Sequence, residues 1–200
     1  RKEQMNILVC VKQVPDTTAV KIDPVTNTLI RAGVPSILNP FDGFALEMAL
    51  QMKDKTGGTV TVMSMGPAQA EDVLRESLSV GADEAYLVSG REFGGSDTLA
   101  TSYILSCAVR AVEEKRGEKF DVIYCGKQAI DGDTGQVGPE MAEHLGYTQI
   151  TYATELVACE GDKVQVRKET ADGYDVLEAA LPVVISVTKT PFELRYPTVK

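Results

Sequence analysis

Residues 125–146 read CGKQAIDGDTGQVGPEMAEHLG, and the fold can be worked out from this stretch outwards. The hydrophobic run that leads into it, residues 120–125, predicts a buried β-strand. A glycine-rich loop follows, and residues 136–145 then predict a helix with Pro139 in its first turn and Gly146 directly after its end. A strand, a glycine-rich turn and a helix start in this order predict a phosphate cradle, because unpaired backbone N–H groups and the positive end of the helix dipole face the loop.

The residue types of this loop favour an anionic ligand. Gly132 and Gly135 permit positive φ angles and let a ligand approach the backbone. Thr134 and Gln136 carry side chains that can donate hydrogen bonds to phosphate or ribose oxygens. Lys127 supplies a positive charge, so the loop predicts a site for a nucleotide phosphate.

Two carboxylates in the same loop leave alternatives open. Asp131 and Asp133 repel a pyrophosphate, so they fit a nucleotide only if they cap the helix, accept backbone N–H groups or reach a ribose hydroxyl. An ordinary βα connection capped by aspartate would contain the same residues. A hydrolase or transferase acting on a phosphate ester is a further alternative, in which these carboxylates bind Mg²⁺, but no other general base is evident.

Composition narrows the class of protein. The 200 residues, 44% of them hydrophobic, suffice for one large α/β domain with a substantial core. The formal net charge of −9 argues against general nucleic-acid binding, and no apolar run approaches the length of a membrane span. The four cysteines show no metal-binding spacing, which predicts free thiols in a reducing, cytoplasmic compartment. Since His144 is the single histidine, a histidine triad elsewhere is excluded, and the side chains suit holding a cofactor better than acid–base catalysis.

Strands and helices alternate along the chain up to Gly146. The predicted strands are residues 5–11, 59–64, 84–88 and 120–125, and the predicted helices are residues 43–55, 68–79, 98–114 and 136–145. This order predicts a doubly wound α/β fold, in which a mostly parallel sheet carries helices on both faces. Ligands bind such sheets at the carboxyl ends of the strands, where Cys10, Met65 and the loop after Cys125 are expected to converge.

The pattern changes after Gly146. Residues 149–158, 163–169, 174–180 and 183–187 are expected to form antiparallel strands added to one edge of the sheet, with a hairpin turn at residues 160–162. A separate β-hairpin is predicted earlier, from residues 20–23 and 28–31 around a turn at residues 24–27. Asn39 stands before Pro40 at the expected start of a helix, and capping is its simplest role.

Four motifs resemble the electron-transfer flavoprotein β subunits: VKQVPD at residues 11–16, NPF at 39–41, GPAQ at 66–69 and GKQAIDGDT at 126–134. The resemblance covers residues 5–200. It implies a nucleotide- and flavin-binding α/β domain over residues 5–188 and the start of a partner-recognition segment at residues 189–200, while the family's C-terminal arm is expected to be missing from this chain.

The family's β-subunit signature is matched with two departures. It runs from Val166 to Ser186, but Ala171 stands where an acidic residue is usual and Asp175 stands where Glu or Gln is usual. These positions are expected to be structural, so the departures weaken the local signature and leave the assignment in place.

The resemblance also implies where the ligand binds. In the family the nucleotide lies against the end of the first strand, the NPF element, a methionine after the next strand and the glycine-rich loop. The cofactor-binding residues carried over are Cys10, Asn39, Pro40, Phe41, Asp42, Met65, Gly126, Lys127, Gln128, Ala129, Ile130, Asp131, Gly132, Asp133, Thr134, Gly135, Gln136 and Val137. The resemblance implies neither a catalytic residue nor a metal ligand.

Two forms of the family differ in this loop. One form holds AMP as a structural ligand, and the other holds a second FAD and splits electron pairs from NADH. The AMP form tends to carry a third acidic residue at the position of Gly132 and bulkier polar residues at those of Thr134 and Gly135. The sequence DGDTGQVGP is therefore similar to the FAD-holding, electron-bifurcating form, with AMP as the alternative ligand.

The resemblance thus implies an electron carrier that works in a heterodimer with an α subunit and is not a stand-alone enzyme. NADH would be the donor, one electron would reach a ferredoxin or flavodoxin, and the other would reach an acyl-CoA dehydrogenase through the α-subunit flavin. A nucleotide-sensing module of similar α/β layout is the other candidate, and the strand-rich region after Gly146 argues against it.

Overall fold

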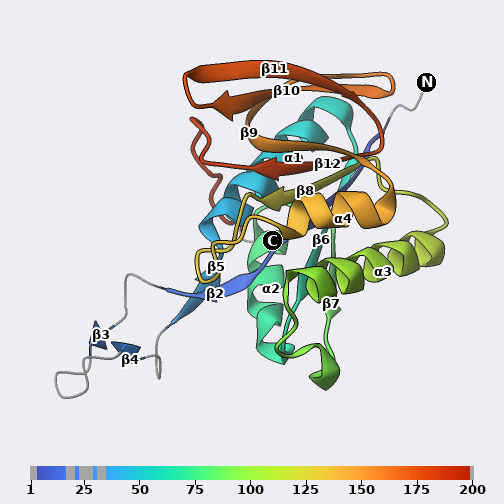
Figure 1. Cartoon of the computed structure of the whole chain (residues 1–200). Helices are drawn as coiled ribbons and strands as arrows, with labels where there is room; N and C mark the ends of the chain where they lie inside the picture. The colour runs from blue at the N-terminus through green and yellow to red at the C-terminus, as the bar shows by residue number, and fades with distance from the viewer. Residues whose placement is uncertain (1–3, 17–20, 23–28, 31–34, 199–200) are drawn as a thin grey trace.

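A computed structural model describes residues 4–16, 21–22, 29–30 and 35–198. Its centre is an eight-stranded sheet in the order β11-β10-β9-β12-β8-β1-β6-β7 (Figure 1). The strands are β1 (Asn6–Cys10), β6 (Thr59–Met65), β7 (Glu84–Val88), β8 (Val122–Gly126), β9 (Thr148–Glu160), β10 (Lys163–Thr170), β11 (Gly173–Ala180) and β12 (Val183–Val187). From β9 to β7 every neighbouring pair is parallel, while β9, β10 and β11 pair antiparallel.

Helices cover both faces of this sheet. They are α1 (Pro40–Thr56), α2 (Glu71–Ser79), α3 (Thr98–Arg116) and α4 (Val137–Leu145), with short 3-10 turns at Ala68–Ala70 and Arg91–Phe93. Buried side chains of α1 and α2 share one core cluster with Ile7 and Val9, whereas those of α3 and α4 share the other with Leu8 and Cys10. Because successive strand residues point to opposite faces, this alternation along β1 places one helix pair on each side.

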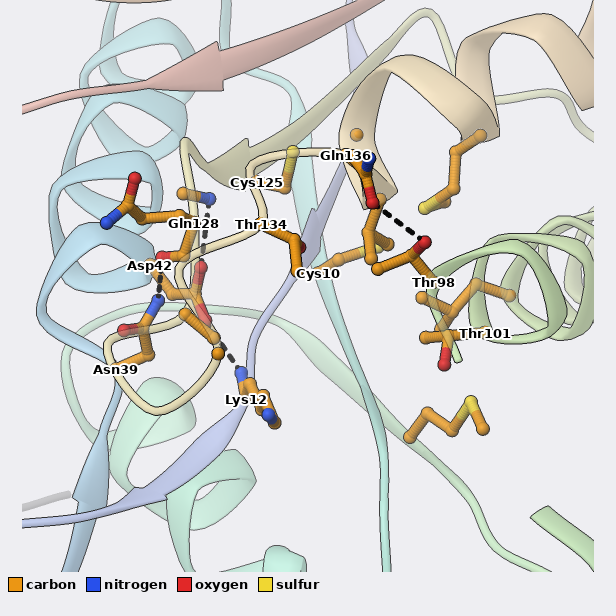
Figure 2. Close-up of a pocket in the computed structure, with 18 of the residues that line it drawn as sticks. Cys10, Lys12, Asn39, Asp42, Thr98, Thr101, Cys125, Gln128, Thr134 and Gln136 are labelled. Carbon is orange, nitrogen blue, oxygen red and sulfur yellow. Dashed lines mark hydrogen bonds between the residues drawn. The ribbon is translucent and has the colours of Figure 1, made fainter. Parts of the chain in front are cut away.

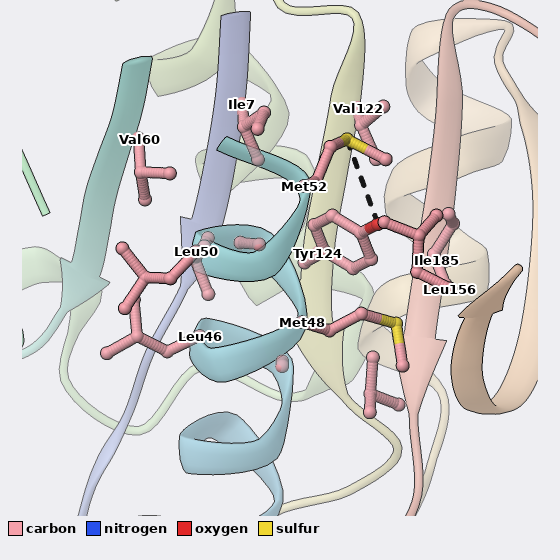
Figure 3. Packing of buried hydrophobic residues seen from close by; sticks show 14 of the residues in the cluster. Ile7, Leu46, Met48, Leu50, Met52, Val60, Val122, Tyr124, Leu156 and Ile185 are labelled. Carbon is pink, nitrogen blue, oxygen red and sulfur yellow. Dashed lines mark hydrogen bonds between the residues drawn. The ribbon is translucent and has the colours of Figure 1, made fainter. Parts of the chain in front are cut away.

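Helix α1 lies across the middle of the sheet and forms the larger core. Its Leu46, Met48, Leu50 and Met52 face strand residues of β1, β8 and β12 (Figure 3). The fully buried Tyr124 donates its hydroxyl hydrogen bond to the sulfur of Met52 at 3.9 Å. The helix ends at Gly57, whose φ of 66° allows its N–H to reach the carbonyl of Lys53.

The doubly wound fold and the antiparallel extension at one edge are confirmed, and most predicted elements recur within a few residues. One expectation was wrong: β12 is not part of the antiparallel addition. It lies between β8 and β9 and runs parallel to both. All five of its residues are buried, as is usual for an inner parallel strand that is covered on both faces.

The region before α1 forms two small antiparallel pairs. Strands β3 (Lys21–Ile22) and β4 (Leu29–Ile30) form the predicted hairpin, whose turn lies outside the described residues. Strands β2 (Gln13–Pro15) and β5 (Ser36–Leu38) form a second pair that the sequence did not predict. Within the described part of the chain, no helix is long and apolar enough to cross a membrane.

Candidate functional site

A cavity of about 630 Å³ opens at the carboxyl edge of the parallel strands (Figure 2). The ends of β1, β6 and β8 form its floor, the loop from β8 to α4 forms one wall, and the start of α3 forms the wall opposite. Its size falls within the range of about 300–1,000 Å³ that is usual for ligand pockets. The cavity is therefore where the topology of an open α/β sheet places a ligand.

The loop from β8 to α4 keeps its glycine-rich turn open through two residues with positive φ. Gly135 has a φ of 64°, which the absence of a side chain permits. The second is Asp133, with a φ of 55°, whereas Gly132, which also permits a positive φ, does not adopt one. Aspartate tolerates this conformation better than most residues. The N–H groups of Gly132 and Asp133 both donate to the carbonyl of Ala129, which closes the turn.

Asn39 braces this loop and does not cap helix α1. Its side chain makes no capping bond. Instead, Nδ2 donates to the carbonyl oxygen of Gln128 at 2.9 Å, and Oδ1 accepts the N–H of Ile130 at 3.2 Å. The simplest role expected for Asn39 was therefore wrong, because the amide fixes a loop that lies about ninety positions further along the chain.

Asp42, in the first turn of α1, holds two strand ends together. One carboxylate oxygen accepts the N–H of Lys12 after β1 at 2.8 Å, and the other accepts the N–H of Gly126 at the end of β8 at 2.9 Å. Burial raises the pKa of this carboxyl to about 7, although the two backbone donors act in the opposite direction. Asp42 thus sets the spacing of the cavity floor and carries a titratable group beneath it.

Sulfur-containing side chains line the apolar part of the cavity. Cys10 and Cys125 are register partners at the ends of β1 and β8, and Met63, Met65 and Met141 lie around them. Burial raises the pKa of the Cys10 thiol to about 12 and that of Cys125 well above its ordinary value, so both thiols stay protonated at neutral pH. This wall offers a polarizable apolar surface suited to a flat ring.

The carboxylates of the loop are engaged within the protein. Asp131 accepts two hydrogen bonds from the ammonium group of Lys12, at 2.9 and 3.0 Å, and Asp133 accepts one from Gln128 at 2.7 Å. Neither caps α4, and the residue before this helix, Gln136, makes no side-chain cap either. Pro139 has no N–H and that of Glu140 donates to the carbonyl of Gln136, so the N–H groups of Val137 and Gly138 are the ones left without a side-chain cap at the cavity lining.

The structure brings most of the implied cofactor-binding residues to the cavity. Those that line it are Cys10, Asn39, Asp42, Met65, Gly126, Lys127, Gln128, Ala129, Gly132, Asp133, Thr134, Gly135, Gln136 and Val137. Pro40, Phe41, Ile130 and Asp131 are not part of the lining. Phe41 lies beside it, since the ammonium group of Lys127 sits 4.9 Å from the centre of its ring.

The wall formed by α3 was missed at the sequence level. Ser96, Asp97, Thr98 and Thr101 line the cavity opposite the loop. Asp97 caps α3 by accepting the N–H of Ala100 at 2.8 Å, and Thr98 donates to Gln136 across the cavity at 3.0 Å. Its position in the chain could have predicted this wall, because a polar segment that follows β7 lies at the same carboxyl edge of the sheet as the other site residues.

Fold and cavity together define the class: a doubly wound α/β domain with a cofactor-sized pocket at the carboxyl edge of its parallel strands. The family described as electron transfer flavoprotein domain matches residues 26–199. The electron transfer flavoprotein subunit beta of Megasphaera elsdenii is 59% identical, covering 98% of this chain and 73% of the relative.

Two further relatives are similar over nearly the same span. The caffeyl-CoA reductase-Etf complex subunit CarD of Acetobacterium woodii is 52% identical, covering 98% of this chain and 72% of the relative. Protein FixA of Azotobacter vinelandii is 50% identical, covering 96% of this chain and 68% of the relative. The chain therefore belongs to the electron transfer flavoprotein β-subunit family.

Proposed function

We propose that this chain is the β subunit of a heterodimeric electron transfer flavoprotein and that its cavity holds FAD. One observation carries the proposal. The cavity joins two surfaces that a dinucleotide needs, namely the uncapped start of α4 beside an open glycine loop, and an apolar wall of cysteine and methionine side chains. AMP in the same cavity is the alternative.

The polar surface suits phosphate groups. The N–H groups of Val137 and Gly138 are available because no side chain caps them, and the positive end of the helix dipole points the same way. Thr134 and Gln136 add side-chain donors beside the loop. Of the two negative charges in the loop, that of Asp131 is offset by its ion pair with Lys12, and the carboxylate of Asp133 accepts a hydrogen bond from Gln128.

The apolar surface suits a ring system. Protonated thiols and thioethers provide polarizable contacts without adding charge, and the floor beneath them is fixed by the two bonds of Asp42. A bound flavin would supply the redox chemistry, taking electrons from NADH and passing them on one at a time. The residues of this chain would bind and orient it and limit the access of water.

Small residues in the loop support FAD over AMP. At Gly132 a Cβ atom would meet no other atom within 4 Å, so the space beside this position is open. Gly135 likewise leaves the turn without a side chain where its φ of 64° disfavours one. An extended ligand has more room along this loop than beside the larger side chains typical of the AMP form.

The partners in this proposal follow from the family and from a relative's name. The α subunit would carry the second flavin, and NADH, a ferredoxin or flavodoxin, and an acyl-CoA dehydrogenase would complete the electron path in the cytoplasm. CarD is named as a subunit of a caffeyl-CoA reductase complex, which supports a partner that acts on CoA esters. Residues 189–200 would begin the segment that recognises such a partner.

The test is the identity and stoichiometry of the nucleotide released from the native α/β pair. We expect two FAD molecules per pair, detected by absorbance and chromatography after denaturation. A yield of one FAD and one AMP would overturn the FAD assignment and leave the family role intact. The variant Gly132→Glu should lower the FAD content of the β site without unfolding the chain, because the added side chain starts in open space. The control is Asp72→Glu, on the exposed face of α2.

A further inference from the structure

Tyr152 has an unusual backbone for its type. It is one of two non-glycine residues with positive φ in the described chain, and its φ is 57°. For a bulky side chain this conformation is strained, and such strain tends to persist where it serves a site. Nothing in the proposed function accounts for it, because Tyr152 does not line the cavity.

The pairing around Tyr152 shows how the strain arises. Ile150 and Ala153 of β9 are the register partners of Ile185 and Val187 of β12, so β9 carries one more residue between them than β12 does. The register of β9 with β10 also shifts at Ala153. A bulge of this kind re-aims a side chain out of the regular alternation.

The bulge places the Tyr152 ring next to two ammonium groups. Lys127 Nζ lies 5.8 Å from the ring centre and Lys168 Nζ lies 5.6 Å from it. Lys168 also donates to the hydroxyl of Thr151 at 2.7 Å. Within the described residues, neither ammonium group forms an ion pair with a carboxylate. Two uncompensated cations that share one ring are unexpected in a chain with a net charge of −9.

Lys127 connects this group to the cavity. It belongs to the cavity lining, and its backbone N–H is fixed to the carbonyl of Val187 at 2.8 Å. Its ammonium group lies close to the rings of both Phe41 and Tyr152, at 4.9 and 5.8 Å from their centres. The two aromatic rings thus stabilise the positive charge of Lys127 beside the cavity.

We propose that Lys127, Tyr152 and Lys168 form a phosphate subsite at the rim of the cavity. The inference rests on the proposed nucleotide role of the cavity and adds a second anionic contact to it. The phosphate can come from two sources: the second phosphate of the nucleotide already in the cavity, or a phosphate group of a separate molecule that docks at the rim. Tyr152 acts as a positioning residue, because it orients two charges and need not touch the ligand.

The first experiment compares AMP with ADP, which differ by one phosphate. The α/β pair is stripped of nucleotide, and both ligands are titrated by calorimetry at constant ionic strength. Wild type should bind ADP about tenfold more tightly than AMP, as expected for one charge-assisted contact at a partly exposed site. Lys168→Met should bring this ratio close to one and leave AMP affinity within about twofold. Lys163→Met is the matched control, since this exposed lysine of the same strand pairs with Glu178.

A second variant separates positioning from folding. Tyr152→Gly removes the ring and relieves the positive φ, so the ADP preference should fall while the urea midpoint does not. If Tyr152 were only structural, its removal would lower the midpoint and leave the ADP-to-AMP ratio unchanged, and this would overturn its assigned role.

The two sources of phosphate give different results. If the second phosphate of the bound nucleotide occupies the subsite, the ratio responds as described. If a separate molecule supplies it, ADP and AMP bind equally, and inorganic phosphate binds the AMP-loaded pair in wild type and Lys163→Met but not in Lys168→Met. If AMP binds but neither the ADP preference nor the binding of inorganic phosphate is seen, the subsite is overturned and the proposed function is not. The same holds if Lys168→Met weakens association with the α subunit, because this lysine would then bind a carboxylate of the partner. Failure to bind either nucleotide would overturn the proposed function together with the subsite.

Discussion

Asp42 is the residue whose ionisation matters most for the site. Its pKa is 3.8 for the free side chain and about 7 in the folded protein, so the folded state retains a proton that the unfolded state releases. The contribution of Asp42 to stability is therefore largest at low pH and is lost as the pH rises through that window. A buried carboxylate with two backbone donors destabilises the fold once it is charged, despite its good hydrogen bonds.

The variant Asp42→Asn tests whether ionisation of Asp42 lowers stability as the pH rises. The variant cannot titrate, but its amide nitrogen would face either the N–H of Lys12 or that of Gly126, so we expect a loss of about 1–3 kcal/mol from the unmatched donors. The urea midpoint of wild type should fall more between pH 5 and pH 8 than that of the variant. Parallel pH profiles of the two proteins would contradict the raised pKa.

Gly138 is required by the close approach of α4 to β8. A Cβ atom at this position would lie 2.7 Å from the sulfur of Cys125. We expect Gly138→Ala to destabilise the protein by about 1–3 kcal/mol through overpacking, measured by urea unfolding. Gly132→Ala should change stability by less than about 0.5 kcal/mol, because its Cβ meets nothing. Adding Cys125→Ala to Gly138→Ala should recover part of the loss, whereas strictly additive effects would show that the sulfur contact is not the cause.

At the scale of elements, helix α1 and the loop after β8 depend on each other through Asn39. A capping role and a bracing role predict different results for Asn39→Ser, since serine caps helices as well as asparagine does. Serine cannot provide both the Nδ2 donor to Gln128 and the acceptor for Ile130. We therefore expect Asn39→Ser to destabilise the protein by about 1–2 kcal/mol and to speed hydrogen exchange at the Ile130 amide. Unchanged exchange there would favour the capping role.

Elements that local patterns define were predictable, and those that depend on distant pairing were not. Strand β7 and helix α3 recur within two residues because their periodicity and the cap at Asp97 are local signals. The place of β12 depends on which strands it joins, although the nearly continuous apolar run VVISV favours an inner parallel strand over an edge. Likewise, the glycine-rich loop made one wall of the cavity predictable. The opposite wall, from α3, consists of ordinary polar residues that are brought to the cavity only when the sheet folds.

At the scale of the whole molecule, α1 connects the cavity with the end of the described chain. Its first turn carries Asp42 at the cavity floor, and further along the helix Glu47 binds Arg195. The guanidinium donates to both oxygens of Glu47, at 2.9 and 3.0 Å, and to Asp54 at 2.9 Å. Thr198 then donates its N–H to the carbonyl of Ser79 at the end of α2, so residues 195–198 are attached to both α1 and α2.

Removing one partner of this ion pair should cost more than removing both. The Glu47 side chain is only 7% exposed, so Arg195→Met leaves a buried carboxylate without its cation. We expect a loss of about 2–3 kcal/mol in urea unfolding, less than for a fully buried pair because the Arg195 side chain is 32% exposed. The Thr198 amide should exchange faster, since the segment loses its attachment to α1.

The double variant Glu47→Met/Arg195→Met decides whether the charge or the packing causes this loss. It removes both charges, so its stability should exceed that of Arg195→Met, because an apolar pair leaves no carboxylate unpaired at a buried position. Exchange at Thr198 should nevertheless stay fast in the double variant, since Arg195 also donates its backbone N–H to Glu47 and both acceptor oxygens are gone. If stability and exchange recovered together, methionine packing alone would hold residues 195–198 in place, and the ion pair would not be what attaches them to α1.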